Sequence, residues 1–408
     1  MKTGNYTLAL VLLSFHMLLA QVNDSLILRK PGAPDINALN TVSFNLPKAG
    51  LNQLHHAKGK KLKLKTSRII VNGDTLAIKH VHVRGNTSSF FIRKSLNIKT
   101  SKKSIFHTST DTFSLNKFYA ISMNMDRNYV RNKISFAVMK LVDVATPSNC
   151  YSDLLINGGS EGLYLIYYPP DEYAMKKYLA PFVIRRGYGE AMDKVYTNND
   201  VNRQEEKDLK KRFRLLYAPA TLNKNGEELY NEISSLLDLN SYFSWLAFNH
   251  LFQNGDYADE AYFMWRPEKS KFEIIPWDFD DILKDQPHEG VGERAKSQRD
   301  KLIYSLEDEL DKKIASDPYV YKKYLDVYTV LLQTLTSEKL REILTDVFND
   351  AYPYYLKEDL LAQSRFDQFG QTDLTNLEAD LHSIYQYISF KADGLRKDIE
   401  SGSLRVTH

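Results

Sequence analysis

The chain has 408 residues, of which 43% are hydrophobic and 26% are charged, and its formal net charge is +3. This length suffices for two regions with hydrophobic cores of their own, and the composition is that of a globular protein, not of a disordered or membrane-embedded chain. The small net charge gives no reason to expect nucleic acid or an acidic lipid surface as a partner.

The N-terminal residues predict export. Lys2 precedes an uncharged apolar run from Leu8 to Ala20, which is short for a membrane span and has the length of a secretory signal. We therefore expect residues 1–20 to be a signal peptide and residues 21–41 a linker. The mature protein should be secreted or periplasmic, with no integral membrane segment left after cleavage.

Cys150 is the only cysteine. A single cysteine excludes an internal disulfide and a thiolate metal site. Because its neighbours look like the entry to a strand, we expect a packed, inert thiol in preference to a catalytic one.

Residues 42–190 are predicted to form a β-rich region. Asn72-Gly73-Asp74 and Asn157-Gly158-Gly159 are tight-turn signals between short apolar runs, so each predicts a hairpin. The segment Lys58–Lys65 alternates lysine and leucine as a half-buried strand does. Its lysines favour a solvated strand face over a substrate-binding patch.

Lys94 lies in a further predicted strand, Phe91–Thr100, in which Lys94, Leu96 and Ile98 share one face. If the two apolar residues face the core, the lysine points inward as well and needs an anion, for which a nucleotide phosphate would serve. The alternative is that the lysine bends outward at the strand end to reach solvent. After it, an amphipathic helix is expected over Asn128–Val142, with Asp126 as its N-cap.

From about residue 191 to residue 402 the apolar spacing is helical. This stretch is interrupted by the segment 249–283, around which we expect the site to be built. A helix over Leu239–Leu251 ends before Asn254-Gly255-Asp256, and two short strands follow, the second of which runs into Asp278 and Asp280. A hairpin brings its ends together, so Asp256 should lie close to these two residues. Carboxylates gathered in this way repel one another unless a cation or a raised pKa relieves them, which predicts a metal site.

Four sequence blocks of the chain belong together. The most specific block combines Asn254-Gly255-Asp256 with Ile275-Pro276-Trp277-Asp278-Phe279-Asp280. The other three are Arg84-Gly85-Asn86-Thr87-Ser88 with the strand RKSLNIK that follows it, Arg131-Asn132-Lys133, and Asn157-Gly158 with Gly162-Leu163-Tyr164-Leu165. In these four blocks the chain resembles the CotH kinase family, and the resemblance spans about residues 42 to 400.

The resemblance implies an α+β, atypical protein-kinase-like fold of two lobes, a β-rich N-terminal lobe over 42–190 and a mainly helical C-terminal lobe over 191–402. It further implies transfer of phosphate from ATP, with Mg²⁺ or Mn²⁺, to serine or threonine hydroxyls of secreted or cell-surface proteins. The implied roles are as follows: Asp256 is the catalytic aspartate; Asp278 and Asp280 hold the metal; Lys94, Arg84 and Asn254 contact the nucleotide or support its loop.

Two positions depart from the family pattern. Ala261 stands where many members have a metal-binding asparagine, so Glu260 is the candidate substitute ligand. Tyr168 stands where many members have glutamate. Two other functions therefore stay open, a catalytically inactive, kinase-like extracellular binding module and a two-metal phosphohydrolase. The second needs clustered metal ligands, whereas the histidines are scattered, and His250 is better explained as a helix-end residue than as a ligand.

Overall fold

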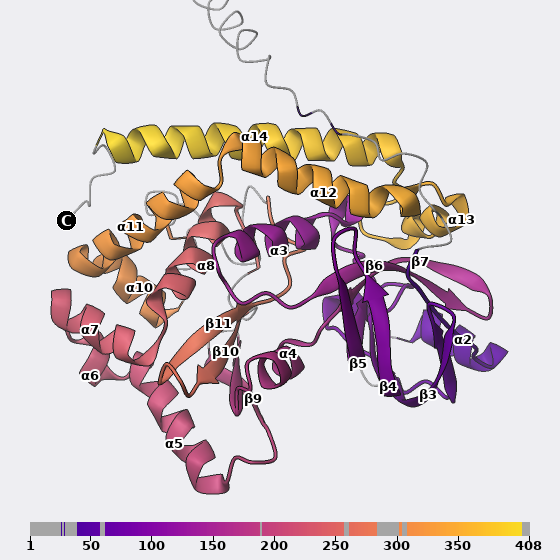
Figure 1. The fold of residues 1–408 in the computed structure, drawn as a ribbon, viewed down its shortest axis with the longest axis horizontal. Coiled ribbons are helices and arrows are strands. Elements are labelled where there is room, and N and C mark those ends of the chain that lie inside the picture. The colour runs from indigo at the N-terminus through magenta and orange to yellow at the C-terminus, as the bar shows by residue number, and fades with distance from the viewer. Residues whose placement is uncertain are drawn as a thin grey trace, which may run out of the picture.

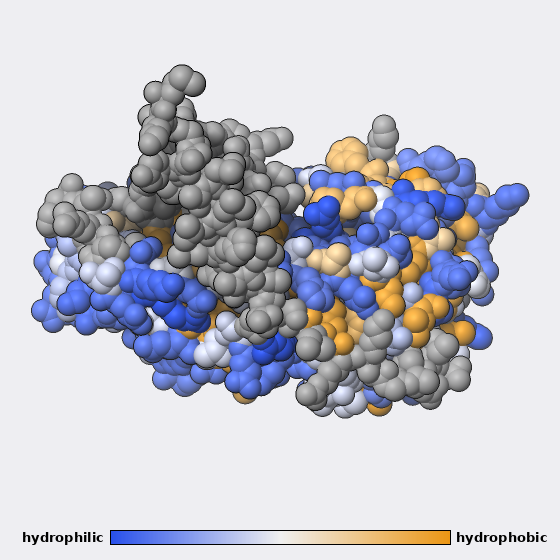
Figure 2. Space-filling model, turned by 90° about the horizontal axis from the view of Figure 1, so that it is seen from above, coloured by the Kyte–Doolittle hydropathy of each residue, from blue (hydrophilic) through white to orange (hydrophobic). Residues whose placement is uncertain are grey.

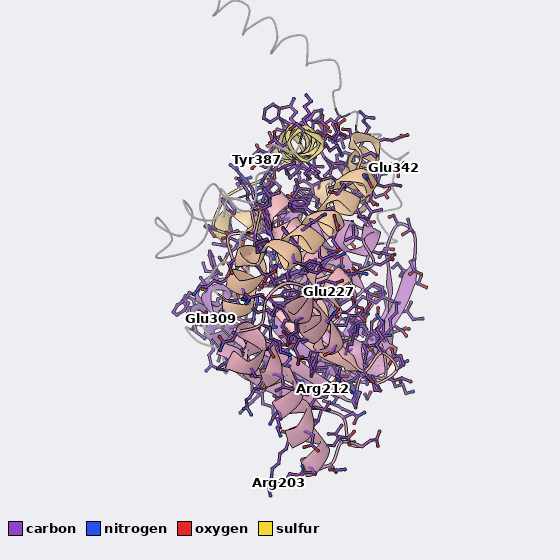
Figure 3. The ribbon with its side chains drawn as sticks, turned by 90° about the vertical axis from the view of Figure 1, so that its left-hand side faces the viewer. Arg203, Arg212, Glu227, Glu309, Glu342 and Tyr387 are labelled. Atoms are coloured by element: carbon purple, nitrogen blue, oxygen red, sulfur yellow. The ribbon has the colours of Figure 1, made fainter. Side chains whose placement is uncertain are left out.

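The computed structural model of this chain describes residues 26, 28, 39–57, 62–187, 190–256, 261–283, 302–303 and 308–401. The β-rich part comes first and the helical part follows, which confirms the predicted α+β class. In Figure 1 the strands of the first part lie at the right, and α14 runs along the whole top edge above α12. Figure 3 looks along α14, which Tyr387 marks at the top of the molecule, while Arg203 marks α5 at the bottom.

The first part of the chain forms a closed barrel. Six of its neighbouring strand pairs are antiparallel, and the parallel pairing of β1 with β6 closes the ring. Its strands, in the spatial order β1-β2-β3-β4-β5-β7-β6, are β1 (Thr41–Phe44), β2 (Arg68–Val71), β3 (Asp74–Val83), β4 (Leu96–His107), β5 (Thr112–Ile121), β6 (Asn149–Ile156) and β7 (Gly159–Tyr167).

Buried and half-buried residues alternate along these strands, and the buried ones form the barrel core. On β4, Leu96 and Ile98 are fully buried, while Asn97 and Lys99, which alternate with them, are half-buried. Closure leaves few free strand edges, and the inward residues of all seven strands make one apolar cluster. Cys150 belongs to this cluster, so the prediction of a packed thiol is confirmed, and its burial raises the pKa of the thiol.

The second sheet carries the hairpin of the predicted site. Its strands are antiparallel, in the order β11-β10-β8-β9, and are β8 (Phe182–Gly187), β9 (Glu190–Thr197), β10 (Ala261–Arg266) and β11 (Lys271–Pro276). The short helix α4 (Pro170–Lys177) connects the barrel to this sheet and contacts β8 and β10.

The helices lie beside the second sheet, away from the barrel, and along the top of the molecule, where the last of them reach over the barrel (Figure 1) and contact its strands β6 and β7. They are α5 (Arg203–Arg214), α6 (Pro219–Leu222), α7 (Gly226–Leu236), α8 (Leu239–Leu251), α10 (Glu309–Ser316), α11 (Pro318–Thr334), α12 (Ser337–Tyr355), α13 (Glu358–Leu361) and α14 (Leu374–Glu400). In α8 every residue except Asn240 is buried, as expected of a helix that is apolar all round. It therefore forms the centre of the helical part.

The β prediction was wrong for residues 48–56, which form the helix α2 (Lys48–His56). Of the predicted strand Lys58–Lys65, residues 58–61 lie outside the described residues. The remainder lies antiparallel to β3, with a bridge from Lys63 to His82 and a hydrogen bond from the Leu64 amide to the Val81 carbonyl (2.9 Å). Helix α12 continues through Pro353.

The surface seen from above, in Figure 2, is mostly hydrophilic on its described left-hand part, and hydrophobic residues gather toward the end at which Figure 1 places the barrel. Among the described residues, no helix is both long and apolar enough to cross a membrane.

Candidate functional site

The two loops that flank the β10–β11 hairpin lie side by side. Ala261, the first residue of β10, is paired with Pro276, the last residue of β11. Beyond the hairpin, the Gly255 amide donates to the Asp281 carbonyl (2.9 Å), and the Leu283 amide donates to the Phe252 carbonyl (2.7 Å). The predicted approach of these two loops is confirmed. Asp256 therefore stands at one side of this contact and Asp278 to Asp281 at the other.

Asp280 lies within a group of carboxylates. Burial raises its pKa well above the ordinary value, and four further carboxyl groups, those of Asp278, Asp126, Asp281 and Asp256, raise it in addition. Five acidic side chains from three segments of the chain therefore share one region, which we call the carboxylate site. Within the described residues, no group of three or more His, Cys, Asp or Glu side chains is arranged so that it could hold a metal ion.

The backbone at the carboxylate site has an uncommon conformation. Asp278 has a φ of +49°, in the left-handed region that residues other than glycine rarely occupy. It comes directly after the buried Trp277 and before the fully buried Phe279. Such strained residues persist where the surrounding structure holds them, and they cluster at functional sites.

Asp126 joins the carboxylate site from the N-terminus of helix α3 (Arg131–Leu141). Its two carboxylate oxygens accept hydrogen bonds from the Arg131 amide (2.9 Å) and the Asn132 amide (3.0 Å). The helix begins at Arg131 instead of Asn128 and its N-cap is Val130, so the prediction of Asp126 as the N-cap was wrong, although its carboxylate accepts the first two helix amides. Burial raises the pKa of Asp126 to about 6, although Arg131 and these helix amides oppose the shift.

Asn132 links this helix to the acidic loop. Its side-chain nitrogen donates to Asp126 (3.1 Å), and its side-chain oxygen accepts the amide of Phe279 (2.9 Å). Phe279 is flanked by Asp278 and Asp280, so α3 fixes the backbone between them. Sequence reasoning did not assign Asp126 or Asn132 to the site. The Arg131-Asn132-Lys133 block of the resemblance was the available signal.

Arg84 contacts aromatic rings beside the carboxylate site. Its guanidinium carbon lies 4.1 Å from the ring centre of Tyr119 and 4.9 Å from that of Trp277. The two rings pack edge to face, 5.7 Å apart. Tyr167 also packs on Trp277, at 4.5 Å. Arg84 therefore supports the residue that precedes Asp278, through cation–π contacts across the boundary between barrel and second sheet.

Lys94 points inward, as expected, but its described contacts lie within its own loop. The side chain is 3% exposed, and its ammonium donates to the carbonyls of Ser89 (2.8 Å) and Phe91. Burial lowers the pKa of Lys94. Its predicted contact with a phosphate stays a prediction.

Lys117 on β5 is a lysine that sequence reasoning did not single out. It makes ion pairs with Asp171 (3.2 Å) and Glu172 (3.0 Å) at the start of α4. Burial alone would lower the pKa of Lys117, but these two carboxylates raise it. Lys117 lies two residues from Tyr119 on the same face of the strand, so this pair borders the rings that hold Arg84.

Asn254 shapes the loop that carries Asp256. It is 1% exposed, its side-chain nitrogen donates to Asn249 (3.1 Å), and its oxygen accepts the amide of Asp256 (3.2 Å). These contacts are internal, so its predicted contact with a nucleotide stays a prediction. Glu260, the candidate substitute ligand, lies outside the described residues.

His250 is 7% exposed, its ring nitrogen Nδ1 is hydrogen-bonded to the Tyr328 hydroxyl (2.7 Å), and burial lowers its pKa well below the ordinary value. It is a packed histidine in the last turn of α8, in agreement with the expected helix-end role.

Comparisons with known proteins agree with the motif blocks. The chain is 23% identical over 335 residues to the inner spore coat protein H of Bacillus subtilis (strain 168), an alignment that covers 77% of this chain and 85% of the relative. A solved complex of HipA, HipB and operator DNA from Shewanella oneidensis MR-1 was also found. The match covers 71% of this chain and 62% of the chain in that structure, at 13% identity and a TM-score of 0.29. That score is too low to indicate a shared fold.

The model of the family described as CotH kinase protein matches residues 81–394. This range begins in β3 and ends in α14, so it includes the barrel strands from β4 onward, the second sheet, and all described members of the carboxylate site. The chain belongs to the CotH kinase protein family.

Proposed function

We propose that this chain is an exported kinase that transfers the γ-phosphate of ATP, with Mg²⁺ or Mn²⁺, to serine or threonine hydroxyls of secreted or surface proteins. The observation that carries the proposal is the carboxylate site, in which four acidic side chains raise the pKa of Asp280. Phosphoryl transfer depends mainly on positioning and on neutralising phosphate charge. The family description supports the reaction, and the relative's description as a spore coat protein supports a surface location.

The residues fit a hard divalent cation. All candidate ligands are carboxylate oxygens, and the largest influences on Asp280 include no cationic side chain. Mg²⁺ is commonly held by one or two carboxylates and by the phosphates of its substrate, so a complete cage of protein ligands is not required. Asp278 and Asp280 would hold the ion, which would neutralise charge on the phosphates when bound. The proposed arrangement is kinase-like, with the barrel as one lobe and the second sheet and helices as the other.

Asp256 is proposed to accept the hydrogen bond of the attacking hydroxyl, because it lies on the opposite loop from the metal-binding aspartates. The internal contacts of Asn254 make it a positioning residue for this loop. Arg84 is proposed to hold Trp277, and through it Asp278, by its stacked contacts.

Two lysines, Lys94 and Lys117, are candidates for the proposed contact with phosphate. Lys94 would have to leave two carbonyl partners, whereas Lys117 already forms a lysine–carboxylate pair, a feature that kinases use near their phosphates. We favour Lys117. Lys117→Met should then raise KM for ATP at least about tenfold. Lys94→Met should lower the melting temperature and change KM little. If instead Lys94→Met raised KM and Lys117→Met did not, Lys94 would be the lysine that contacts phosphate.

The decisive assay measures transfer of labelled γ-phosphate from ATP to the protein itself and to an added protein acceptor. The wild type should incorporate label with Mg²⁺ or Mn²⁺, and Asp278→Asn should lose at least about 100-fold of the rate while its melting temperature stays within a few degrees. Asp74→Asn, at the exposed first residue of the barrel strand β3, is the matched control and should transfer normally.

Three outcomes would contradict the proposal. Transfer by Asp278→Asn at the wild-type rate would remove the metal role. Nucleotide binding without any transfer would favour the inactive binding module. Phosphate release without an acceptor, dependent on the same aspartates, would favour the phosphohydrolase.

A further inference from the structure

A pocket of about 420 Å³ lies between the turn that precedes α3 and the first turns of α14. Its walls come from residues 124–129, from the segment 367–372, and from one face of α14. Among the carboxylates that act on Asp280, only Asp126 also lines this pocket. The pocket is therefore separate from the proposed site of phosphoryl transfer, and Asp126 stands between the two.

Asp367 in this pocket has unmet hydrogen-bonding capacity. Its side chain is 4% exposed, and one oxygen, Oδ2, pairs with Arg93 and accepts a hydrogen bond from the Tyr129 hydroxyl (2.6 Å). The other oxygen, Oδ1, is buried and has no hydrogen-bond partner among the described residues. An unsatisfied buried acceptor destabilises the protein, so a ligand that donates a hydrogen bond here would relieve that cost.

The charges of the pocket favour a neutral ligand. Asp367 is paired with Arg93, and Asp380 is paired with Arg131 at 2.7 Å. Asp126 is held by two amides at the N-terminus of α3. Because each acidic side chain already has a cationic or dipolar partner, the unmet need is for a hydrogen-bond donor and not for a positive charge.

The remaining walls resemble those that bind sugars. Asn376 and Gln371 offer side-chain amides that donate and accept, and the Ser383 hydroxyl, which donates to the Ala379 carbonyl (2.9 Å), offers an acceptor. Phe369 adds an aromatic ring that is 43% exposed and has the Arg127 guanidinium 5.6 Å from its centre. Planar polar groups beside one apolar ring suit a molecule with hydroxyls at its edge and C–H bonds on its face.

We propose that this pocket binds a neutral polyhydroxylated small molecule, a sugar or a polyol. One hydroxyl donates to Asp367 Oδ1, others meet the amides of α14 and the preceding segment, and the C–H face packs on Phe369. This site does not depend on the proposed kinase activity.

The test titrates the full chain with D-glucose, N-acetyl-D-glucosamine and myo-inositol, with ethanolamine as a cationic probe, by calorimetry and saturation-transfer NMR. Ala379 lines the pocket and is exposed on α14, so Ala379→Trp fills the pocket without removing a hydrogen bond. Gln386→Trp is the matched control, because Gln386 lies two helical turns further along the same exposed face and outside the pocket.

At least one hydroxylated probe should bind the wild type and Gln386→Trp with a Kd in the millimolar range or tighter, and Ala379→Trp at least about tenfold more weakly. Phe369→Ala should weaken the same probe, which keeps the test valid if Ala379→Trp folds poorly. No binding of any hydroxylated probe to the wild type, binding unchanged in both pocket variants, or binding of ethanolamine alone would each overturn the proposal.

Discussion

At the scale of single residues, the carboxylate site retains repulsion that folding alone does not relieve. Asp280 has a raised pKa from burial and from four neighbouring carboxyl groups, and burial raises the pKa of Asp126 to about 6. A carboxyl whose pKa is higher in the folded than in the unfolded chain binds its proton more tightly when folded. Its stabilising contribution is present below the unfolded pKa of about 4 and is lost as the pH rises through the folded pKa.

The stability of the metal-free protein should therefore fall as the pH rises from about 4 to about 6 and beyond. In Asp280→Asn this fall should be smaller, because one of the titrating groups is gone. Chemical denaturation in EDTA at several pH values measures both effects. Adding Mg²⁺ at neutral pH should stabilise the wild type and leave the variant nearly unchanged. If the wild type and Asp280→Asn showed the same dependence of stability on pH, Asp280 would not be the group whose titration destabilises the protein.

Asn132 is expected to act on turnover through the acidic loop. Asn132→Ala removes the acceptor of the Phe279 amide and one donor to Asp126, which should cost about 1–3 kcal/mol and also lower kcat. Ser135→Ala on the same helix removes only a hydrogen bond to the Arg131 carbonyl, so it should change stability slightly and kcat not at all. Equal kcat values for the two variants would mean that Asn132 is only structural.

The residues of the site were predictable to different extents. Asp256, Asp278 and Asp280 lie on either side of one short hairpin, so local sequence was enough to predict their approach. Asn132 contacts Phe279 across 147 residues of sequence and Asp126 comes from the same distant segment, an approach that no periodicity reveals. The partners of Lys94 were equally out of reach, because strand alternation gives the direction of a side chain but not what it meets.

At the scale of elements, turns and central helices follow from local sequence. Both predicted tight turns formed, with Asn72 and Asn157 at positive φ and a glycine after each, as hairpin turns require. The bounds of α8 agree with the prediction at both ends. Its boundary was predictable because Asp238 caps one end and the Asn254-Gly255 loop follows the other.

The elements that were missed depend on tertiary contacts. α12 continues through Pro353, and the two tyrosines after it make distant hydrogen bonds, Tyr354 to the Tyr151 carbonyl (2.9 Å) and Tyr355 to the Asn128 carbonyl (2.9 Å). These hydrogen bonds offset the loss of the backbone hydrogen bond that a proline cannot donate within a helix. Strand β5 was not anticipated, because its buried residues Leu115 and Phe118 are three positions apart, which interrupts the alternation of a strand where its register against β4 shifts.

The contact between α14 and α8 leads to a second prediction of how stability changes with pH. Lys391 on α14 donates to the His250 carbonyl at the end of α8, and burial lowers its pKa to about 7. The unfolded chain then binds one more proton than the folded chain between about pH 7 and 10, so stability should rise with pH across that interval. Lys391→Met should flatten this rise, and Lys397→Met, at an exposed position of the same helix, should not. If the stability of Lys391→Met still rose with pH as in the wild type, the titration of Lys391 would not be the cause.

At the scale of the whole molecule, the carboxylate site lies where three parts of the chain meet. The turn before helix α3 supplies Asp126, the loop after α8 supplies Asp256, and the loop after β11 supplies Asp278 to Asp281. Arg84 adds a contact from the barrel to Trp277. None of these parts holds the site alone, so we expect metal binding to stabilise the parts against one another.

The most direct test of the proposed metal role is a crystal structure with Mn²⁺ and a non-hydrolysable ATP analogue, in which anomalous scattering locates the ion. The proposal predicts an anomalous peak about 2.1 Å from carboxylate oxygens of Asp278 and Asp280 and in contact with the phosphates, with Asp256 facing the γ-phosphate. A nucleotide bound without a peak at these aspartates, or a peak elsewhere in the molecule, would contradict it.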